Sequence, residues 1–141
     1  MTDRGAVILI EQDKVVLIRR EKNGRVYYVF PGGKQEIGET IEQCAKREAF
    51  EELGVEVEVG ELLTTVPFNG TQYYFFAKII GGQFGAGEGE EFLEPHGGTY
   101  MPLWMPISEL DDKTVIPHEV VTALKNYICL LYTSPSPRDR G

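Results

Sequence analysis

The chain has 141 residues and a formal net charge of −8, which is enough length for one domain with a real core. An acidic protein does not attract nucleic acid through its overall field, so we expect no nucleic-acid partner. No apolar run is long enough to cross a bilayer, and the N-terminus lacks a signal-peptide pattern, so no membrane association is expected either.

Three short apolar runs lie near the start of the chain. Residues 6–10 and 15–18 are rich in β-branched side chains and are separated by a polar turn, which predicts a hairpin or paired strands. Residues 26–30 predict a third strand. It ends at Pro31-Gly32-Gly33, which we interpret as a turn.

A short helix is expected next. Thr40 and Gln43 have the spacing of a capping box, and Gly54 follows Leu53 as a C-terminal stop. These signals predict a helix that begins after Thr40 and ends before Gly54.

This helix carries Glu48, Glu51 and Glu52 at i, i+3 and i+4, a spacing that places them on one face. Like charges so placed repel one another, which favours a bound cation, and clustered carboxylates suit Mg²⁺ or Mn²⁺. On a helical wheel Glu48 and Glu52 fall within the stripe of small apolar residues, and Glu51 lies at its edge. The alternative for such a cluster by itself is a solvated charged face.

Beyond the helix, turn residues and alternation predict three more strands and a closing helix. We expect strands at residues 55–63, 71–80 and 100–105. The last of these contains two prolines, which favour an edge strand or an irregular segment. Pro117 can begin a final helix over residues 118–127. Mixed strands with two helices predict an α/β fold.

The segment Cys129–Gly141 resembles the translation of a common transposase-based sequencing adapter. We therefore expect a single domain over residues 1–128 and a non-native tail over 129–141, which leaves the natural C-terminus missing. The alternative is a disordered Ser/Pro tail. If residues 129–141 are non-native, Cys44 is the only native cysteine. A single cysteine precludes an intrachain disulfide and favours a reducing, cytoplasmic location.

The stretch from Gly33 to Val55 resembles the signature of the Nudix hydrolases, Gly-x5-Glu-x7-Arg-Glu-U-x-Glu-Glu-x-Gly-U, where U is a bulky aliphatic residue. Ala49 stands at the first U position; it is small but apolar, so the departure concerns packing and not chemistry. The resemblance implies an α/β/α sandwich around a mixed β-sheet. The positions in register are Gly33, Glu39, Arg47, Glu48, Glu51, Glu52, Gly54 and Val55.

The resemblance also implies roles for the residues of the box. Family members hold divalent metal ions with their box glutamates, so Glu48 and Glu52 are expected to ligate Mg²⁺ or Mn²⁺, with Glu51 as a third ligand, direct or through water. A carbonyl ligand is implied at Gly33. The other catalytic or structural positions are Arg47, which would orient the carboxylates, Glu39, which would brace the loop, and Gly32 and Gly54.

A further acid from outside the box is common in the family. The glycine- and glutamate-rich segment 81–91 offers Glu88, Glu90 and Glu91, of which Glu90 and Glu91 are preferred as metal ligands and Glu91 as a catalytic general base. The alternative is a polar surface loop.

Substrate contacts are less sharply indicated. Arg19 and Arg20 are adjacent in a strand and point to opposite faces, so at most one of them faces the site. Arg19 is the candidate, with surface roles for both as the alternative. Phe30 and Tyr74 are candidates for contact with a nucleotide. Other aromatic residues are as readily explained by core or rim packing, namely Tyr27, Phe68, Phe92 and Trp104.

Together these features predict a Mg²⁺-dependent pyrophosphohydrolase acting on a nucleoside diphosphate derivative, with nucleoside triphosphates, including oxidised ones, as the first expectation. ADP-ribose, other nucleotide sugars and dinucleoside polyphosphates are the alternative substrates. A non-catalytic nucleotide-sensing domain is the alternative of another class, although such domains usually lose box carboxylates. We expect a small-molecule nucleotide as partner and either a monomer or a homodimer.

Overall fold

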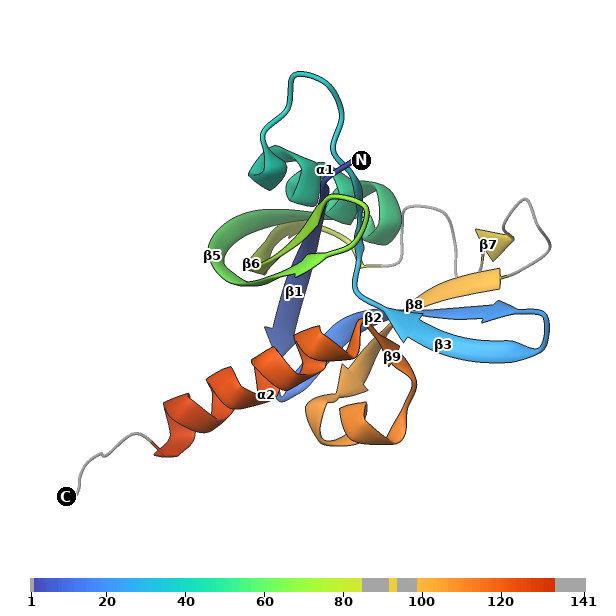
Figure 1. Ribbon diagram of the computed structural model, residues 1–141, viewed down its shortest axis with the longest axis vertical. Coiled ribbons are helices and arrows are strands. Elements are labelled where there is room, and N and C mark those ends of the chain that lie inside the picture. The colour runs from blue at the N-terminus through green and yellow to red at the C-terminus, as the bar shows by residue number, and fades with distance from the viewer. Residues whose placement is uncertain (1, 85–91, 94–98, 134–141) are drawn as a thin grey trace.

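A computed structural model describes residues 2–84, 92–93 and 99–133 of the chain (Figure 1). Nine strands and two α-helices are assigned within these residues. The strands are β1 (Arg4–Glu11), β2 (Lys14–Lys22), β3 (Arg25–Val29), β4 (Gly32–Lys34), β5 (Val55–Pro67), β6 (Thr71–Gly82), β7 (Phe92–Leu93), β8 (Thr99–Pro106) and β9 (Val115–Ile116). The helices are α1 (Ile41–Leu53), α2 (His118–Thr133) and a 3₁₀ helix, Ile107–Asp112.

The strands form a mixed sheet in the order β5-β6-β1-β2-β3-β9. Strand β1 runs parallel to β6 and antiparallel to β4, and it forms the expected hairpin with β2, in which Ile10 lies opposite Val15. Strand β2 pairs antiparallel with β3 and with β8. Helix α1, which precedes β5 in the chain, packs against β1 and β5.

Strand β1 alternates its side chains between two apolar layers. Val7 and Leu9 pack into a core under α1, whereas Ala6 and Ile8 pack into a second core under α2. Helix α1 therefore covers one face of the sheet and α2 the other, as Figure 1 shows. This confirms the predicted α/β/α sandwich around a mixed sheet.

Local signals set the ends of α1 as predicted. The Gln43 N–H donates to Thr40 Oγ1 over 3.0 Å, and the Thr40 N–H donates to Gln43 Oε1 over 2.9 Å, which completes the capping box. Gly54 adopts the left-handed conformation with φ 78°, and its N–H donates to the Phe50 carbonyl.

The Pro31-Gly32-Gly33 segment is not the turn that its composition indicated. Gly32 to Lys34 form β4, which pairs with residues 4–6 of β1. The reason is close packing, since a Cβ on Gly32 would lie 2.6 Å from the Ala6 Cβ. Glycine is required here because two backbones approach each other closely, and not because the chain turns.

Later elements differ from expectation in length, and three short ones were not predicted, namely β7, the 3₁₀ helix Ile107–Asp112 and β9. Strand β5 continues to Pro67, and helix α2 continues to Thr133, into the segment predicted to be non-native. A helix there does not bear on where those residues originate. Beyond Tyr100, β8 pairs only with β2 among the described residues, so its prolines lie on an edge as expected. No helix in residues 2–84, 92–93 and 99–133 is long and apolar enough to cross a membrane.

Candidate active site

Helix α1 packs closely on β1 of the sheet. A Cβ on Gly5 of β1 would lie 2.8 Å from the Ile41 carbonyl oxygen, and the facing helix residues Cys44, Ala45 and Ala49 are buried. Small side chains on both surfaces permit this approach. Consequently the carboxylates farther along α1 reach the backbone of β4.

Arg47 connects most of the acidic side chains of the site. Its Nε and Nη2 donate to the two carboxylate oxygens of Glu39 over 3.1 and 2.8 Å. Its Nη1 donates to Glu48 over 3.0 Å and to Glu51 over 3.2 Å, and Nη2 also reaches the Lys34 carbonyl. The planar fork of arginine suits this bidentate arrangement. Arg47 thus holds three carboxylates of the box by hydrogen bonds.

Glu39 anchors the loop before α1. Besides Arg47, its Oε1 accepts from the Glu36 N–H over 2.9 Å, and its carbonyl accepts from Gln35 Nε2. The hydrogen bond from Arg47, followed by that from the Glu36 backbone, lowers the pKa of Glu39 from 4.5 to about 2. The charged carboxylate is therefore the form that the fold stabilises.

We expect this pKa shift to appear in the acid unfolding of the protein. A carboxyl whose pKa is lowered on folding stabilises the fold above its unfolded value of 4.5 and loses that contribution as pH falls towards about 2. Glu39→Gln should therefore lose less stability than the wild type between these pH values. Urea denaturation of both proteins across that range measures the difference, and equal slopes would contradict it.

Glu48 lies against the backbone of β4. Its carboxylate occupies the space that a Cβ on Gly33 would need, and its side chain is 15% exposed. Burial raises the pKa of Glu48, while the hydrogen bond from Arg47 acts in the opposite direction. Glycine at position 33 is therefore explained by the carboxylate that lies beside it.

Glu52 is the deepest acid of the site. Its Oε1 accepts from the Gly32 N–H over 2.9 Å. Burial, with the charge of Glu48 as the second cause, raises the pKa of the Glu52 carboxyl to about 8. Two neighbouring carboxylates in a desolvated position are stabilised by a bound cation, and oxygen donors of this kind suit Mg²⁺ or Mn²⁺.

Two of the expected metal ligands, Glu51 and the Gly33 carbonyl, make contacts with other residues of the site. The Glu51 side chain is 54% exposed and pairs with Arg47, because it lies at the edge of the inward stripe of α1. The Gly33 carbonyl accepts from Cys44 Sγ over 3.3 Å, which leaves its second lone pair for another contact. In the described parts of the chain, no three His, Cys, Asp or Glu side chains are grouped to hold a metal ion. Glu48 and Glu52 thus both lie against the Gly32–Gly33 backbone, whereas Glu51 is more exposed and is linked to Glu48 through Arg47 Nη1.

The two adjacent glycines give a matched pair of variants. Gly33→Ala would displace the flexible end of Glu48, so we expect turnover to fall roughly tenfold to a hundredfold with a folded protein. Gly32→Ala would press on Ala6 and on the Gly5 carbonyl, so its main effect should be a loss of about 1–3 kcal/mol in stability. Thermal unfolding and steady-state assays of both variants check this, and the reverse pattern would contradict the placement of Glu48.

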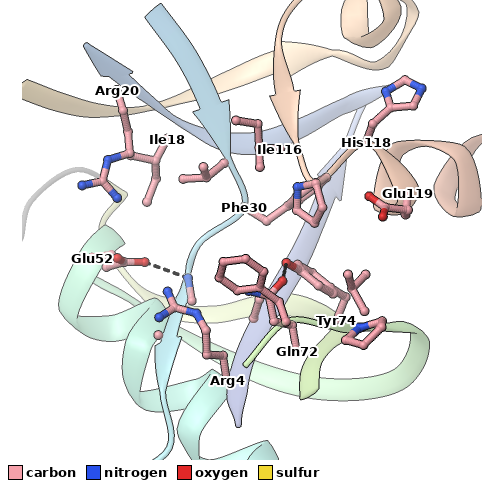
Figure 2. Close-up of a pocket in the computed structure, with 18 residues that line it drawn as sticks. Arg4, Ile18, Arg20, Phe30, Glu52, Gln72, Tyr74, Ile116, His118 and Glu119 are labelled. Atoms are coloured by element: carbon pink, nitrogen blue, oxygen red, sulfur yellow. Dashed lines mark hydrogen bonds between the residues drawn. The ribbon is translucent and has the colours of Figure 1, made fainter. Parts of the chain in front are cut away.

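A cavity of about 690 Å³ opens beside Glu52 and the two glycines (Figure 2). Arg4 and Arg20 line it near Glu52, and Phe30 and Tyr74 line its middle. The rings of Phe30 and Tyr74 meet edge to face, with centroids 5.8 Å apart. Phe30 and Tyr74, the two aromatic candidates for contact with a nucleotide, thus both line the cavity.

Of the two neighbouring arginines, the structure places Arg20 on the cavity and Arg19 away from it. Arg19 pairs with Glu21 at 3.6 Å. Strand alternation required that only one face the site but could not say which, because that depends on the register of β2 against its neighbours. Arg4 also lines the cavity, although a single arginine near the N-terminus carries no signal in the sequence.

The remaining candidates divide into three groups. Phe68 lines the rim of the cavity, with 64% of its surface exposed. Trp104 packs on Phe84 in the core under α1, and Tyr27 borders a different surface hollow. The proposed acids from segment 81–91 lie outside the described residues and stay predictions, namely Glu88, Glu90 and Glu91. The side chain of Phe92 is not described either.

Comparison with known proteins identifies the family and supports the fold. The model of the NUDIX domain matches residues 1–124. The chain therefore belongs to the NUDIX family. Among solved structures, a NUDIX hydrolase from Nitrosomonas europaea superposes with a TM-score of 0.72 at 21% identity, covering 91% of this chain and 88% of the other. The E. coli ORF135 protein gives a TM-score of 0.65 at 22% identity over 97% of this chain and 95% of that one.

Curated relatives match over part of their length. The human 8-oxo-dGDP phosphatase NUDT18 is 40% identical over 81 residues, which cover 55% of this chain and 25% of that protein. The putative nudix hydrolase 1 of Caenorhabditis elegans is 37% identical over 95 residues, which cover 62% of this chain and 26% of its own length. The chain thus spans about a quarter of these two relatives.

Proposed function

We propose that this chain hydrolyses a phosphoanhydride bond of a nucleoside diphosphate derivative, with divalent metal held by Glu48 and Glu52. The observation that supports this best is the position of the two carboxylates. They lie side by side at the Gly32–Gly33 backbone, at one end of a cavity of about 690 Å³. A nucleotide needs a cavity of this order.

The donor set fits a hard divalent cation, because both side chains offer carboxylate oxygens. Burial and then the charge of Glu48 raise the pKa of Glu52 to about 8, and a bound cation would favour the charged carboxylate that acts as a ligand. A bound Mg²⁺ or Mn²⁺ supplies phosphate neutralisation and a water of lowered pKa. Glu90 or Glu91 is proposed as the further acid.

The chain's own residues then position the substrate. Arg47 holds Glu48 by a 3.0 Å hydrogen bond, so that this carboxylate keeps one orientation. Arg4 and Arg20 line the cavity beside Glu52 and are placed to neutralise phosphate oxygens. Local cations of this kind are necessary because the chain as a whole is acidic, with a net charge of −8.

Nucleoside triphosphates and oxidised nucleotides remain the first substrates to test. The names of two relatives, the human and mouse 8-oxo-dGDP phosphatases, support this class. Nucleotide sugars and dinucleoside polyphosphates are the alternative substrates. Hydrolysis of any of these substrates would release a nucleoside phosphate, after water attacks one phosphorus atom of the phosphoanhydride bond.

The experiment is a panel of these nucleotides incubated with the protein and Mg²⁺, with products identified by mass. We expect cleavage of at least one member, abolished by EDTA and restored by Mg²⁺ or Mn²⁺. Failure to cleave any member with either metal would contradict the proposal. Tight binding of a nucleotide without cleavage would instead indicate a sensing domain.

A further inference from the structure

The cavity has two chemically different ends. At one end Arg4 and Arg20 lie beside Glu52, and at the other lies Glu119, on the first turn of α2. Figure 2 shows the Glu119 carboxylate across the cavity from Glu52, with Phe30 between them. An anionic phosphate is attracted by the two guanidinium groups and repelled by Glu119. If the proposed function holds, the phosphates lie at the arginine end and the nucleoside extends towards Glu119.

The middle of the cavity suits a flat aromatic ring. Phe30 and Tyr74 provide apolar surface, and Val66, Pro67 and Ile116 complete the walls. Aromatic rings bind such surfaces through stacked or edge-to-face contacts. The base of a nucleotide is the part with this shape, and its hydrogen-bonding edge would then meet the polar groups at the far end.

Glu119 is available for such a contact. Its side chain makes no hydrogen bond or ion pair with another residue in the described part of the chain. Its charge nevertheless reaches into the cavity, because it adds to the rise in the pKa of Tyr74, to about 12, that burial chiefly causes. A carboxylate only accepts hydrogen bonds, and its two oxygens match two adjacent N–H donors.

Among the common bases, only guanine presents two adjacent N–H donors, at N1 and N2, on its Watson–Crick edge. Adenine and cytosine place a ring acceptor next to their amino group, and that acceptor would face the carboxylate. Hypoxanthine has the N1–H but lacks the amino group. An oxidised guanine altered at C8 keeps the same edge as guanine. Enzymes that bind single bases in pockets commonly recognise this edge.

Gln72 adds a second polar group, beside Tyr74 in the middle of the cavity. Its Oε1 accepts from the Tyr74 hydroxyl over 2.8 Å, so its amide N–H₂ is the group left to donate. Guanine carries an acceptor, O6, beside N1–H. An acceptor from Glu119 and a donor from Gln72 therefore complement the guanine edge.

We propose that Glu119 makes this end of the cavity a guanine subsite, so that the enzyme prefers guanine nucleotides. The inference rests on the proposed function only for the direction in which the nucleotide lies. Glu119 would select the base, whereas the carboxylates of α1 would act on the phosphates and do not distinguish one base from another. Glu119→Gln is the informative change, because it replaces one acceptor by a donor at nearly constant shape.

The test measures binding and not turnover. GMP, IMP and AMP are titrated into the protein by calorimetry, with Mg²⁺ and again with EDTA. We expect GMP to bind roughly tenfold or more tightly than AMP, with IMP between them. In Glu119→Gln the affinity for GMP should fall and that for AMP should rise, because an amide matches the donor and acceptor of adenine.

Glu109→Gln is the matched control, since Glu109 is exposed, lies off the cavity and loses the same charge. It should keep the wild-type preference, and circular dichroism should show all three proteins equally folded. Equal affinities for GMP and AMP in the wild type would overturn the proposal. Absence of GMP binding up to millimolar concentration would do the same, as would an unchanged preference in Glu119→Gln.

These outcomes are separable from the proposed activity. A protein that binds GMP selectively but cleaves no nucleotide would refute the hydrolase and keep the guanine subsite. A protein that cleaves guanine and adenine nucleotides with equal kcat/KM, and binds GMP and AMP equally, would refute the subsite and keep the hydrolase.

Discussion

Glu52→Gln should reduce turnover by at least about a hundredfold while the protein stays folded. The amide keeps the shape of the side chain and an oxygen that can accept from the Gly32 N–H, now 2.9 Å from Glu52 Oε1. It removes the charge that we assign to metal binding. Steady-state assays with Mg²⁺ measure the effect, and near-normal turnover would refute the assignment of Glu52.

The same variant gives a stability signature without metal. Burial and then Glu48 raise the pKa of Glu52 from 4.5 to about 8, so this carboxyl favours the fold at low pH and loses that contribution as pH rises through about 8. With EDTA, Glu52→Gln should therefore be at least as stable as the wild type at pH values above about 8. Mg²⁺ should stabilise the wild type more than the variant.

Glu42→Gln is the control for charge on the same helix. Glu42 is exposed in the first turn of α1, away from the cavity, and should lose only a few tenths of a kcal/mol from weaker interaction with the helix dipole. Its turnover should match that of the wild type. A comparable loss in both variants would show that helix charge, and not the position of Glu52, controls activity.

Arg47→Ala should have the largest effect on stability among the variants of the box. The change removes the hydrogen bonds to Glu39, Glu48 and Glu51 and leaves three carboxylates close together. Because the Arg47 side chain is still 24% exposed, we expect a loss of about 1–3 kcal/mol in place of the larger value for a fully buried pair. Turnover should also fall, since Glu48 would no longer be held.

Arg47→Lys distinguishes geometry from charge. Lysine keeps the positive charge but cannot bond both oxygens of Glu39 with a planar fork while reaching Glu48. It should therefore recover only part of the stability. Urea denaturation of the three proteins measures these differences, and full recovery by lysine would contradict a role for the fork geometry.

Much of the local structure was predictable because the signals are contained in neighbouring residues. The ends of α1 follow from Thr40, Gln43 and Gly54, whose side chain or backbone acts within one helical turn. The aliphatic runs at residues 6–10 and 15–18 predicted a hairpin or paired strands, and the structure confirms a hairpin. The helical-wheel positions of Glu48 and Glu52 predicted that these side chains face the sheet, as the structure shows.

Predictions were wrong or incomplete where the outcome depended on packing against another element. Gly32 and Gly33 form a strand and not a turn, because β1 lies close enough to pair with them. Whether Arg19 or Arg20 faces the cavity depended on register.

The amino-acid sequence alone determined the order of the longer elements, the limits of α1 and the spacing that puts carboxylates on one face of it, since these depend on interactions between near neighbours. Tertiary structure decided which groups share a site. Arg4 of β1, Glu52 of α1 and Glu119 of α2 line one cavity only because these three elements pack on the same sheet. Such contacts between distant residues have no local signal, because their energy arises only when the layers pack.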